Sequence, residues 1–297
     1  MLLSDLIRLL SEYKTKNFQD VEIDGLSYNS LLTKDRDIFI CIRGEAADGH
    51  KYAESAVKNG AKAIFCEEEL NLDVPQIIVK DTKRTMAEIA AAFYNEPSKE
   101  LNLIGVTGTN GKTTVTHLIQ KILEENNEKC ALIGTLGYKL SSSDEYKEAK
   151  HTTPQPPELQ RDLRLMADNN IKNVVMEVSS HSLEQRRVGS CDFNGAVFTN
   201  LTQDHLDYHI TMRNYFKAKA ILFEGLKEGT FAVINADDEY AKDFLGVIPK
   251  GVRVLTYGVK NDADVKASDI DFSVDGAKFT VTFDGKSEKM NLHLNGM

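Results

Sequence analysis

The chain has 297 residues, of which 41% are hydrophobic, and this length allows two domains with buried cores. Its formal net charge is −9 and no segment concentrates Lys and Arg, so we expect no nucleic-acid partner. No apolar run reaches the roughly eighteen residues of a membrane span, so we expect no membrane partner. The four cysteines lie far apart without a CxxC pair, which indicates reduced thiols and a cytoplasmic protein.

The first third of the chain alternates short apolar runs with helical patterns. After an amphipathic helix within residues 1–10, apolar runs fall at 37–42, 62–67 and 75–80, and helical patterns at 52–61 and 82–94. The polar segment 95–102 contains a proline and predicts a domain boundary near residue 98. We therefore expect a small N-terminal α/β domain at 1–98 and a second domain at 99–297.

The second domain begins with a strand at 101–107 and an amphipathic helix at 113–126. Further strands rich in Val, Ile and other apolar residues are expected at 129–135, 173–179, 195–200 and 230–235. Strands separated by helices predict a mostly parallel sheet that is covered on both faces. The end of the chain changes to an antiparallel β extension, with a hairpin around Asp275-Gly276 and a strand at 289–294. The fold class is α/β.

The segment GVTGTNGKTT, residues 105–114, predicts a phosphate-binding loop. A strand, a turn with Gly108 and Gly111, and a helix together place backbone N–H groups and the positive helix end around an anion. Lys112 would reach the outer phosphates, and Thr113 would offer its hydroxyl to Mg²⁺. Val106 stands where the strict P-loop pattern has its first glycine, and Gly108 takes over the tight turn.

Candidate metal ligands follow two of the later strands. Glu177 ends one strand, and Asp204, His205, Asp207 and His209 follow another. Ligands collect at the carboxyl ends of strands in open parallel sheets, which favours hard ligands for a nucleotide-bound magnesium here. The four-residue spacing of His205 and His209 leaves a zinc site as an alternative, although no Glu follows His205 as in zinc hydrolases.

These segments resemble the Mur ligases, the ATP-dependent amide-forming enzymes of peptidoglycan synthesis, and their relative folylpolyglutamate synthase. GVTGTNGKTT is similar to the family's phosphate loop, EVSSH and DHLDYH to its metal-binding segments, and MRNYFKAKAILF to its helix with a lysine carbamylated by CO₂. The resemblance implies ATP binding by Gly108, Thr109, Asn110, Gly111, Lys112, Thr113 and Thr114. It implies catalytic roles for Lys112, Glu177, His205 and Lys219, and magnesium binding by Thr113, Glu177, His205 and the carbamate of Lys219. The residues by themselves favour a solvated lysine at position 219.

The N-terminal segment YNSLLTKDRDIFICIRGEAADGHKY resembles the uridine-binding domain of Mur ligases that add the third amino acid. The resemblance implies substrate contacts by Ser30, Thr152, Thr153, Ser179, Gln185 and Arg187. The family's Asp-Ser-Arg is Asn29-Ser30-Leu31 in this chain, and His151 replaces the Asn of Asn-Thr-Thr-Pro. In VINADD, we expect Asp237 to cap a helix.

The resemblance implies that ATP activates a carboxylate of UDP-MurNAc-L-Ala-D-Glu as an acyl phosphate, to which a diamino acid is added. Either meso-diaminopimelate or L-lysine fits, with meso-diaminopimelate preferred, and we expect a monomer whose partners are small molecules. Relatives continue past NLHLNGM into a third domain, so we expect a truncated chain that forms no product alone. Two alternatives are a folylpolyglutamate synthase-like ligase, which would begin nearer its phosphate loop, and a nucleotide-binding module without catalysis.

Overall fold

The computed structural model describes residues 1–44, 47–147, 151–274 and 276–293. The chain forms two compact units. The first contains residues 1–101, 153–172 and 182–191, and the second contains 102–152, 173–181 and 192–297. The sequence-based division at residue 98 assigns 153–172 and 182–191 to the second domain, and it stays a prediction.

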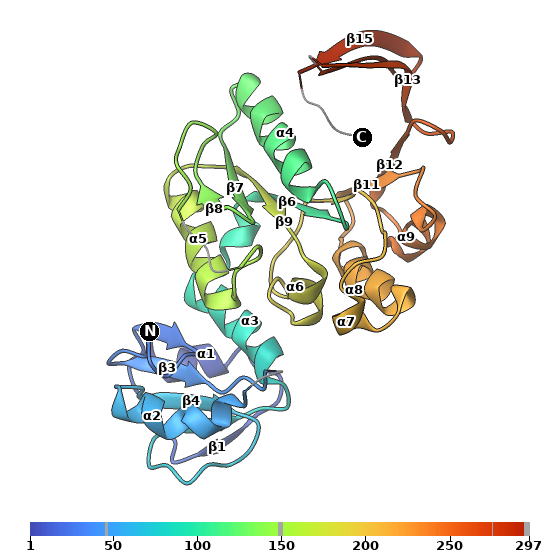
Figure 1. Cartoon of the computed structure of the whole chain (residues 1–297). Coiled ribbons are helices and arrows are strands. Elements are labelled where there is room, and N and C mark those ends of the chain that lie inside the picture. Colours follow the sequence, from blue (N-terminus) through green and yellow to red (C-terminus); the bar gives the residue numbers. More distant parts are fainter. Residues whose placement is uncertain (45–46, 148–150, 275, 294–297) are drawn as a thin grey trace. The chain divides into compact units, whose positions relative to one another are not determined.

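The first unit is built on a five-stranded sheet with the order β1-β5-β4-β3-β2. Figure 1 labels three of these strands, β1, β3 and β4. Strands β2 to β5 pair in parallel, and β1 pairs with β5 antiparallel. Its elements are α1 (Leu3–Ile7), β1 (Lys14–Lys16), β2 (Gly25–Ser27), β3 (Asp37–Ile40), η1 (Gly49–Tyr52), α2 (Ala53–Lys58), β4 (Ala63–Cys66), β5 (Gln76–Ile78), α3 (Thr82–Phe93), η2 (Pro97–Lys99) and α5 (Pro156–Asp168). Helix α6 (Ser180–Glu184) continues from the second unit into the first.

Both faces of this sheet are buried because successive side chains of a strand point to opposite sides. In β3, Ile38 and Ile40 pack in one cluster with residues of α1 and α3. Phe39 lies between them in sequence and packs in a second cluster with Ala53 and Ala56 of α2. A continuous apolar strand is therefore needed here, as the sequence pattern indicated.

The second unit is built on a ten-stranded sheet with the order β15-β14-β13-β12-β11-β10-β6-β9-β7-β8. Its elements are β6 (Asn102–Thr107), α4 (Lys112–Glu125), β7 (Cys130–Gly134), β8 (Gly137–Lys139), β9 (Asn173–Glu177), β10 (Gly195–Phe198), α7 (Leu206–His209), α8 (Met212–Glu224), β11 (Phe231–Asn235), α9 (Ala241–Val247), β12 (Arg253–Gly258), β13 (Val265–Ser273), β14 (Gly276–Phe283) and β15 (Lys286–Leu292). Strands β7, β9, β6, β10, β11 and β12 pair in parallel, so their carboxyl ends share one edge.

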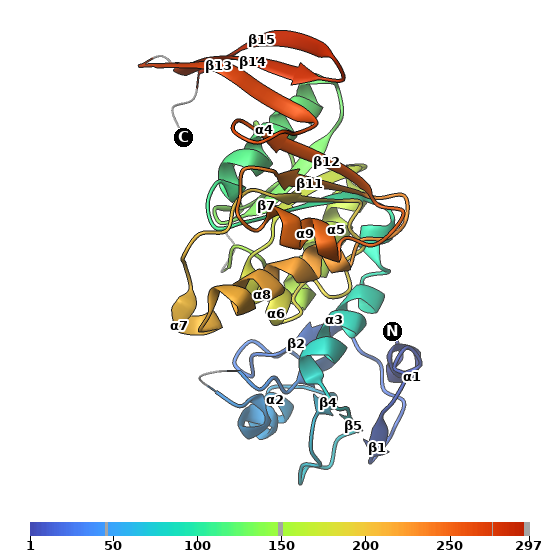
Figure 2. The same ribbon diagram turned by 90° about the vertical axis from the view of Figure 1, so that its right-hand side faces the viewer.

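Strands β13, β14 and β15 form an antiparallel extension of this sheet, coloured red in Figure 2. The hairpin between β13 and β14 pairs Ser273 with Gly276, while Asp275 lies outside the described residues. This arrangement confirms the predicted α/β class. The first sheet is small, and the second is mostly parallel and ends in antiparallel strands. Among the described residues, no helix is long and apolar enough to cross a membrane.

Different helices cover the two faces of the parallel sheet. Val115 and Ile119 of α4 pack against Val106 and Val175 on one face. On the other face, the ring of Phe244 from α9 lies 4.0 Å from Phe198 of β10, and 5.2 Å from Phe223 of α8. These contacts fix α4 and α8, the two helices that contribute to the phosphate loop region.

We predict that Phe244→Ala destabilises the second unit by about 3–5 kcal/mol, because a fully buried ring is replaced by a cavity. Urea denaturation measures the change. The control is Phe272→Ala, since 55% of that side chain's surface is already exposed and its loss should change stability little. Equal effects of the two substitutions would contradict the assignment of the core.

Candidate active site

The phosphate loop connects β6 to α4, as the sequence predicted. Gly108 and Gly111 have φ values of 151° and 83°, in the region that favours glycine. A Cβ atom at Gly108 would lie 1.9 Å from Thr199 Oγ1, so a side chain is excluded there. Gly111 is the N-cap of α4, has a left-handed conformation and provides no side-chain cap, so the first N–H groups of α4 have no partner within the helix.

The segment after β10 holds the loop in place. Asn200 accepts hydrogen bonds from the backbone N–H groups of Thr109 (2.8 Å) and Asn110 (3.0 Å), and Thr199 Oγ1 donates to the carbonyl of Asn110 (2.7 Å). The sequence analysis gave Thr199 and Asn200 no role. Their position directly after a buried strand, at the same edge as the loop, is the signal that could have identified them.

Two lysines converge on one carbonyl of the loop. Lys112 Nζ donates to the Gly108 carbonyl and to that of Thr109, both at 2.9 Å. Lys219 Nζ, from α8, donates to the same Gly108 carbonyl at 2.8 Å. The solvated lysine favoured by the residues alone is therefore wrong for Lys219, which is 1% exposed, while its neighbour Lys217 is exposed.

Burial lowers the pKa of both lysines. The pKa of Lys219 falls well below its ordinary value, first through burial and then through the charge of Lys112. Burial lowers the pKa of Lys112 as well, while Glu177 and Asp204 act in the opposite direction. The amine of Lys219 is thus held toward its neutral, nucleophilic form.

Glu177 lies at the carboxyl end of β9 and is 1% exposed. Both of its carboxylate oxygens accept from Thr113 Oγ1 at 3.0 Å. Thr135, directly after β7, donates its backbone N–H to Oε1 and its hydroxyl to Oε2, both at 3.1 Å. The structure therefore brings two predicted ligands, Thr113 and Glu177, together and adds Thr135, which the sequence analysis missed.

His205 and His209 have different surroundings. His205 lies in a left-handed conformation before α7, about half exposed, with Nε2 3.4 Å from Asp204 Oδ2. His209 is buried with Nε2 2.9 Å from Ser180 Oγ, and burial lowers its pKa to about 4. Among the described residues, the group of three possible ligands that approach within 4.8 Å does not include either histidine, which gives the zinc alternative no support.

That group is formed by Asp48, His50 and Glu68 in the first unit. Both ring nitrogens of His50 are already engaged, Nδ1 with Asp48 Oδ1 at 2.6 Å and Nε2 with the backbone N–H of Glu67 at 2.9 Å. Arg43 also pairs with Glu67 and Glu68. This group is a network of ion pairs and hydrogen bonds.

The predicted substrate contacts fall in both units. Ser30, Thr153, Gln185 and Arg187 belong to the first, and Thr152 and Ser179 to the second. Arg187 donates to the Thr153 carbonyl at 3.0 Å and to Gln185 Oε1 at 2.7 Å, which fixes three of these residues to one another. Ser30 is buried, and its carbonyl accepts from Asn59 Nδ2 at 2.7 Å.

A hydrogen bond between Tyr28 and Glu158 ties the Ser30 segment to α5. Tyr28 Oη donates to Glu158 Oε1 at 3.0 Å, and burial and the Glu158 charge raise the pKa of Tyr28. Arg187 acts on the same hydroxyl with the opposite sign. The sequence analysis missed this pair because its members are separated by 130 positions.

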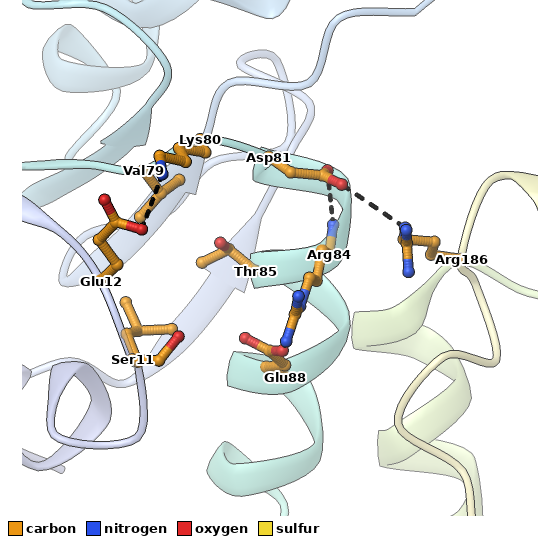
Figure 3. A pocket seen from close by; sticks show the side chains of 10 residues that line it. Ser11, Glu12, Val79, Lys80, Asp81, Arg84, Thr85, Glu88 and Arg186 are labelled. Atoms are coloured by element: carbon orange, nitrogen blue, oxygen red, sulfur yellow. Dashed lines mark hydrogen bonds and ion pairs between the residues drawn. The ribbon is translucent and has the colours of Figure 1, made fainter.

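Figure 3 shows a pocket of the first unit that is lined by residues other than the predicted substrate contacts. Its charged side chains are paired: Lys80 with Glu12 (2.8 Å), Arg84 with Glu88 (2.7 Å) and Arg186 with Asp81 (3.5 Å). The described residues that line it include none of the sequence-predicted site residues.

Comparison with models of protein families identifies the family of this chain. A model described as Mur ligase middle domain matches residues 106–297, and one described as Mur ligase family, catalytic domain matches residues 22–94. The chain belongs to the Mur ligase family.

Individual relatives agree with the family. The UDP-N-acetylmuramoyl-L-alanyl-D-glutamate--2,6-diaminopimelate ligase of Bacillus velezensis is 42% identical over 298 residues, which cover 98% of this chain and 60% of the relative. This Mur ligase chain thus spans 60% of that relative's length. A solved structure of a ligase with the same name superposes with a TM-score of 0.79 at 32% identity, over 92% of this chain and 56% of that one.

Folylpolyglutamate synthase from Mycobacterium tuberculosis shares the fold more distantly. Its TM-score is 0.53 at 15% identity, over 67% of this Mur ligase chain and 51% of the synthase.

The helix cap predicted at Asp237 of this Mur ligase is wrong. Helix α9 begins later, at Ala241, and Asp237 instead accepts hydrogen bonds from the backbone N–H groups of residues 259–261. The neighbouring Asp238 accepts from the N–H of Tyr240, and its other oxygen accepts from Leu201. Each carboxylate satisfies loop N–H groups that no strand or helix pairs.

We predict that Gly134→Ala destabilises the second unit by about 1–3 kcal/mol. The new Cβ would lie 2.3 Å from Glu177 Oε1, so the buried carboxylate would have to leave its hydrogen bonds. The matched control is Gly246→Ala in α9, where a Cβ meets open space and should be neutral or stabilising. Urea denaturation compares the two, and a Gly134→Ala protein as stable as the control would contradict the packing of Glu177.

We also predict a pH effect at Lys219. Its folded-state pKa lies below the ordinary 10.5, so between the two values the unfolded chain binds a proton that the folded chain does not. Stability contributed by this group therefore rises with pH in that window. From about pH 7 to about pH 10, the unfolding free energy of the natural protein should increase more than that of Lys219→Met, in buffers free of CO₂. Parallel pH profiles would show that Lys219 is not held neutral.

Proposed function

We propose that this chain forms the nucleotide-sugar and ATP-binding parts of an ATP-dependent amide ligase of peptidoglycan precursor synthesis. The reaction joins 2,6-diaminopimelate, rather than L-lysine, to UDP-MurNAc-L-Ala-D-Glu. The observation that carries the proposal is the convergence of Lys112, Lys219, Thr113 and Glu177 on one phosphate loop in a chain 42% identical to named diaminopimelate ligases.

The loop suits the triphosphate of ATP. The free N–H groups at the start of α4 and the amine of Lys112 provide positive charge for the transferring phosphoryl group. The side chain of Lys112 reaches across the loop to the Gly108 carbonyl, which keeps its amine at the loop where a phosphate would bind. Transfer of the terminal phosphoryl group from ATP to the substrate carboxylate releases ADP and makes the carboxyl carbon electrophilic, so that an amine can displace phosphate, lose a proton and form the amide.

Thr113 and Glu177 would hold Mg²⁺, since magnesium prefers hydroxyl and carboxylate oxygens. His205 is included because the resemblance to the Mur ligase segment DHLDYH implies it. When bound, the ion offsets the charge of triphosphate and carboxylate. The 3.0 Å contact between Thr113 and Glu177 fits this role because both side chains offer oxygen atoms to one point.

Lys219 suits carbamylation by CO₂. Only a neutral amine attacks CO₂, and burial next to Lys112 lowers the pKa of Lys219 toward that form. The neutral amine would add to CO₂ with loss of a proton, and the carbamate would place an anionic oxygen ligand for magnesium where the buried amine stands. Its negative charge would also be attracted to Lys112.

The resemblance leads us to assign contacts with the UDP-sugar dipeptide to six residues: Ser30, Thr152, Thr153, Ser179, Gln185 and Arg187. The planar fork of Arg187 suits a carboxylate or phosphate. The folylpolyglutamate alternative is less well supported, because residues 22–94 match a Mur ligase family model. A small-molecule ligase also fits the net charge of −9, and we retain the monomer and cytoplasmic location as part of the proposal.

We predict that the purified chain binds UDP-MurNAc-L-Ala-D-Glu saturably in titration calorimetry. Arg187→Ala should weaken binding about tenfold or more, because a charge-assisted contact is lost. The matched control is Arg186→Ala, whose guanidinium lies 3.5 Å from Asp81 and which should bind normally. UDP-MurNAc-L-Ala and a folate test specificity. A chain that binds ATP but no UDP-sugar would favour the module without catalysis, and preferential folate binding would favour the folylpolyglutamate alternative.

A further inference from the structure

The hydroxyl of Thr135 lies between two acceptors of different kinds. Thr135 Oγ1 is 3.1 Å from Glu177 Oε2 and 3.2 Å from Thr152 Oγ1, and it is placed to donate to either. All three residues belong to the second unit.

Thr135 is held close to Glu177. Its backbone N–H donates to Glu177 Oε1 at 3.1 Å. The carboxylate also packs directly against the preceding residue, Gly134 of β7, where a side chain would not fit. Rotation about the Cβ–Oγ1 bond is enough to swing the hydroxyl proton from one acceptor to the other, because both acceptors lie within hydrogen-bond distance of the same oxygen.

A hydroxyl has one proton, so the two bonds compete. An ionised carboxylate is the better acceptor, and the proton therefore favours Glu177 while that group carries its full charge. A cation at Glu177 would draw electron density from the carboxylate oxygens and weaken them as acceptors. The proton of Thr135 would then be donated to Thr152.

We propose that Thr135 is a positioning residue that couples the cation-nucleotide site at Glu177 to the sugar-peptide site at Thr152. The inference rests on the proposed function, which assigns Mg²⁺ to Glu177 and the UDP-sugar dipeptide to Thr152. When the nucleotide and its cation are bound, Thr135 holds the Thr152 hydroxyl in one orientation. Less orientational freedom is then lost when the sugar-peptide binds, so each ligand favours the other.

The test is a coupling measurement by titration calorimetry on the chain. The dissociation constant of UDP-MurNAc-L-Ala-D-Glu is measured alone and with saturating Mg²⁺ and a non-hydrolysable ATP analogue, and the ratio gives the coupling factor. We expect a factor of about five or more in the natural protein. Thr135→Val should bring the factor to about one, while Thr135→Ser, which keeps the hydroxyl, should retain it.

A control and a second variant separate coupling from folding. Thr280→Val changes a threonine of β14 and should keep the natural factor. A purely structural role of Thr135 would alter both dissociation constants by the same ratio and leave the factor unchanged. If Thr135→Val does not fold, Thr135→Ala serves in its place.

The outcomes distinguish this inference from the proposed function. A factor of one in the natural protein, or the same factor in Thr135→Val, would overturn the coupling while the binding assignments stand. Failure of the natural chain to bind the UDP-sugar dipeptide at all would overturn the proposed function and the coupling with it.

Discussion

The carbonyl oxygen of Gly108 is the point on which the site depends. Lys112 and Lys219 both donate to it, at 2.9 and 2.8 Å, although their ammonium groups repel each other. Burial lowers the pKa of both groups, and the charge of Lys112 lowers the pKa of Lys219 further. An anion bound at this loop would offset the positive charge that gathers here. The contact forms only if β6, α4 and α8 meet at one place, so the arrangement of the whole second unit serves it.

Contacts with Thr199 and Asn200 hold the phosphate loop in the position where the two lysines converge. Gly108 has no room for a side chain because Thr199 packs against its Cα. Asn200 accepts hydrogen bonds from the backbone N–H groups of Thr109 and Asn110. The loop backbone is thus fixed before any ligand arrives, and binding an anion would require little reorganisation. Glu177 is prearranged in the same way by Thr113 and Thr135.

The first unit organises its own residues independently. Tyr28 and Glu158 connect the Ser30 segment to α5, and Arg187 is bonded to Thr153 and Gln185. Helix α5 and residues 182–191 belong to this compact unit although they follow the phosphate loop in the chain. A boundary read from composition could not anticipate this, because composition changes along the chain while compactness depends on contacts between distant segments.

The sequence by itself determined the α/β class, most strands of the parallel sheet, the phosphate loop and α4. These features depend on local patterns: apolar runs that must be buried, glycines that permit positive φ, and helical periodicity. Only the tertiary structure showed that Lys219 is buried and that Asp237 accepts hydrogen bonds from the backbone of residues 259–261. It also showed that Thr135 is hydrogen-bonded to Glu177, which is 42 positions away in the chain. Burial and hydrogen bonding of a polar side chain are properties of its neighbours in space, and the strand order that supplies those neighbours is not written in any single segment.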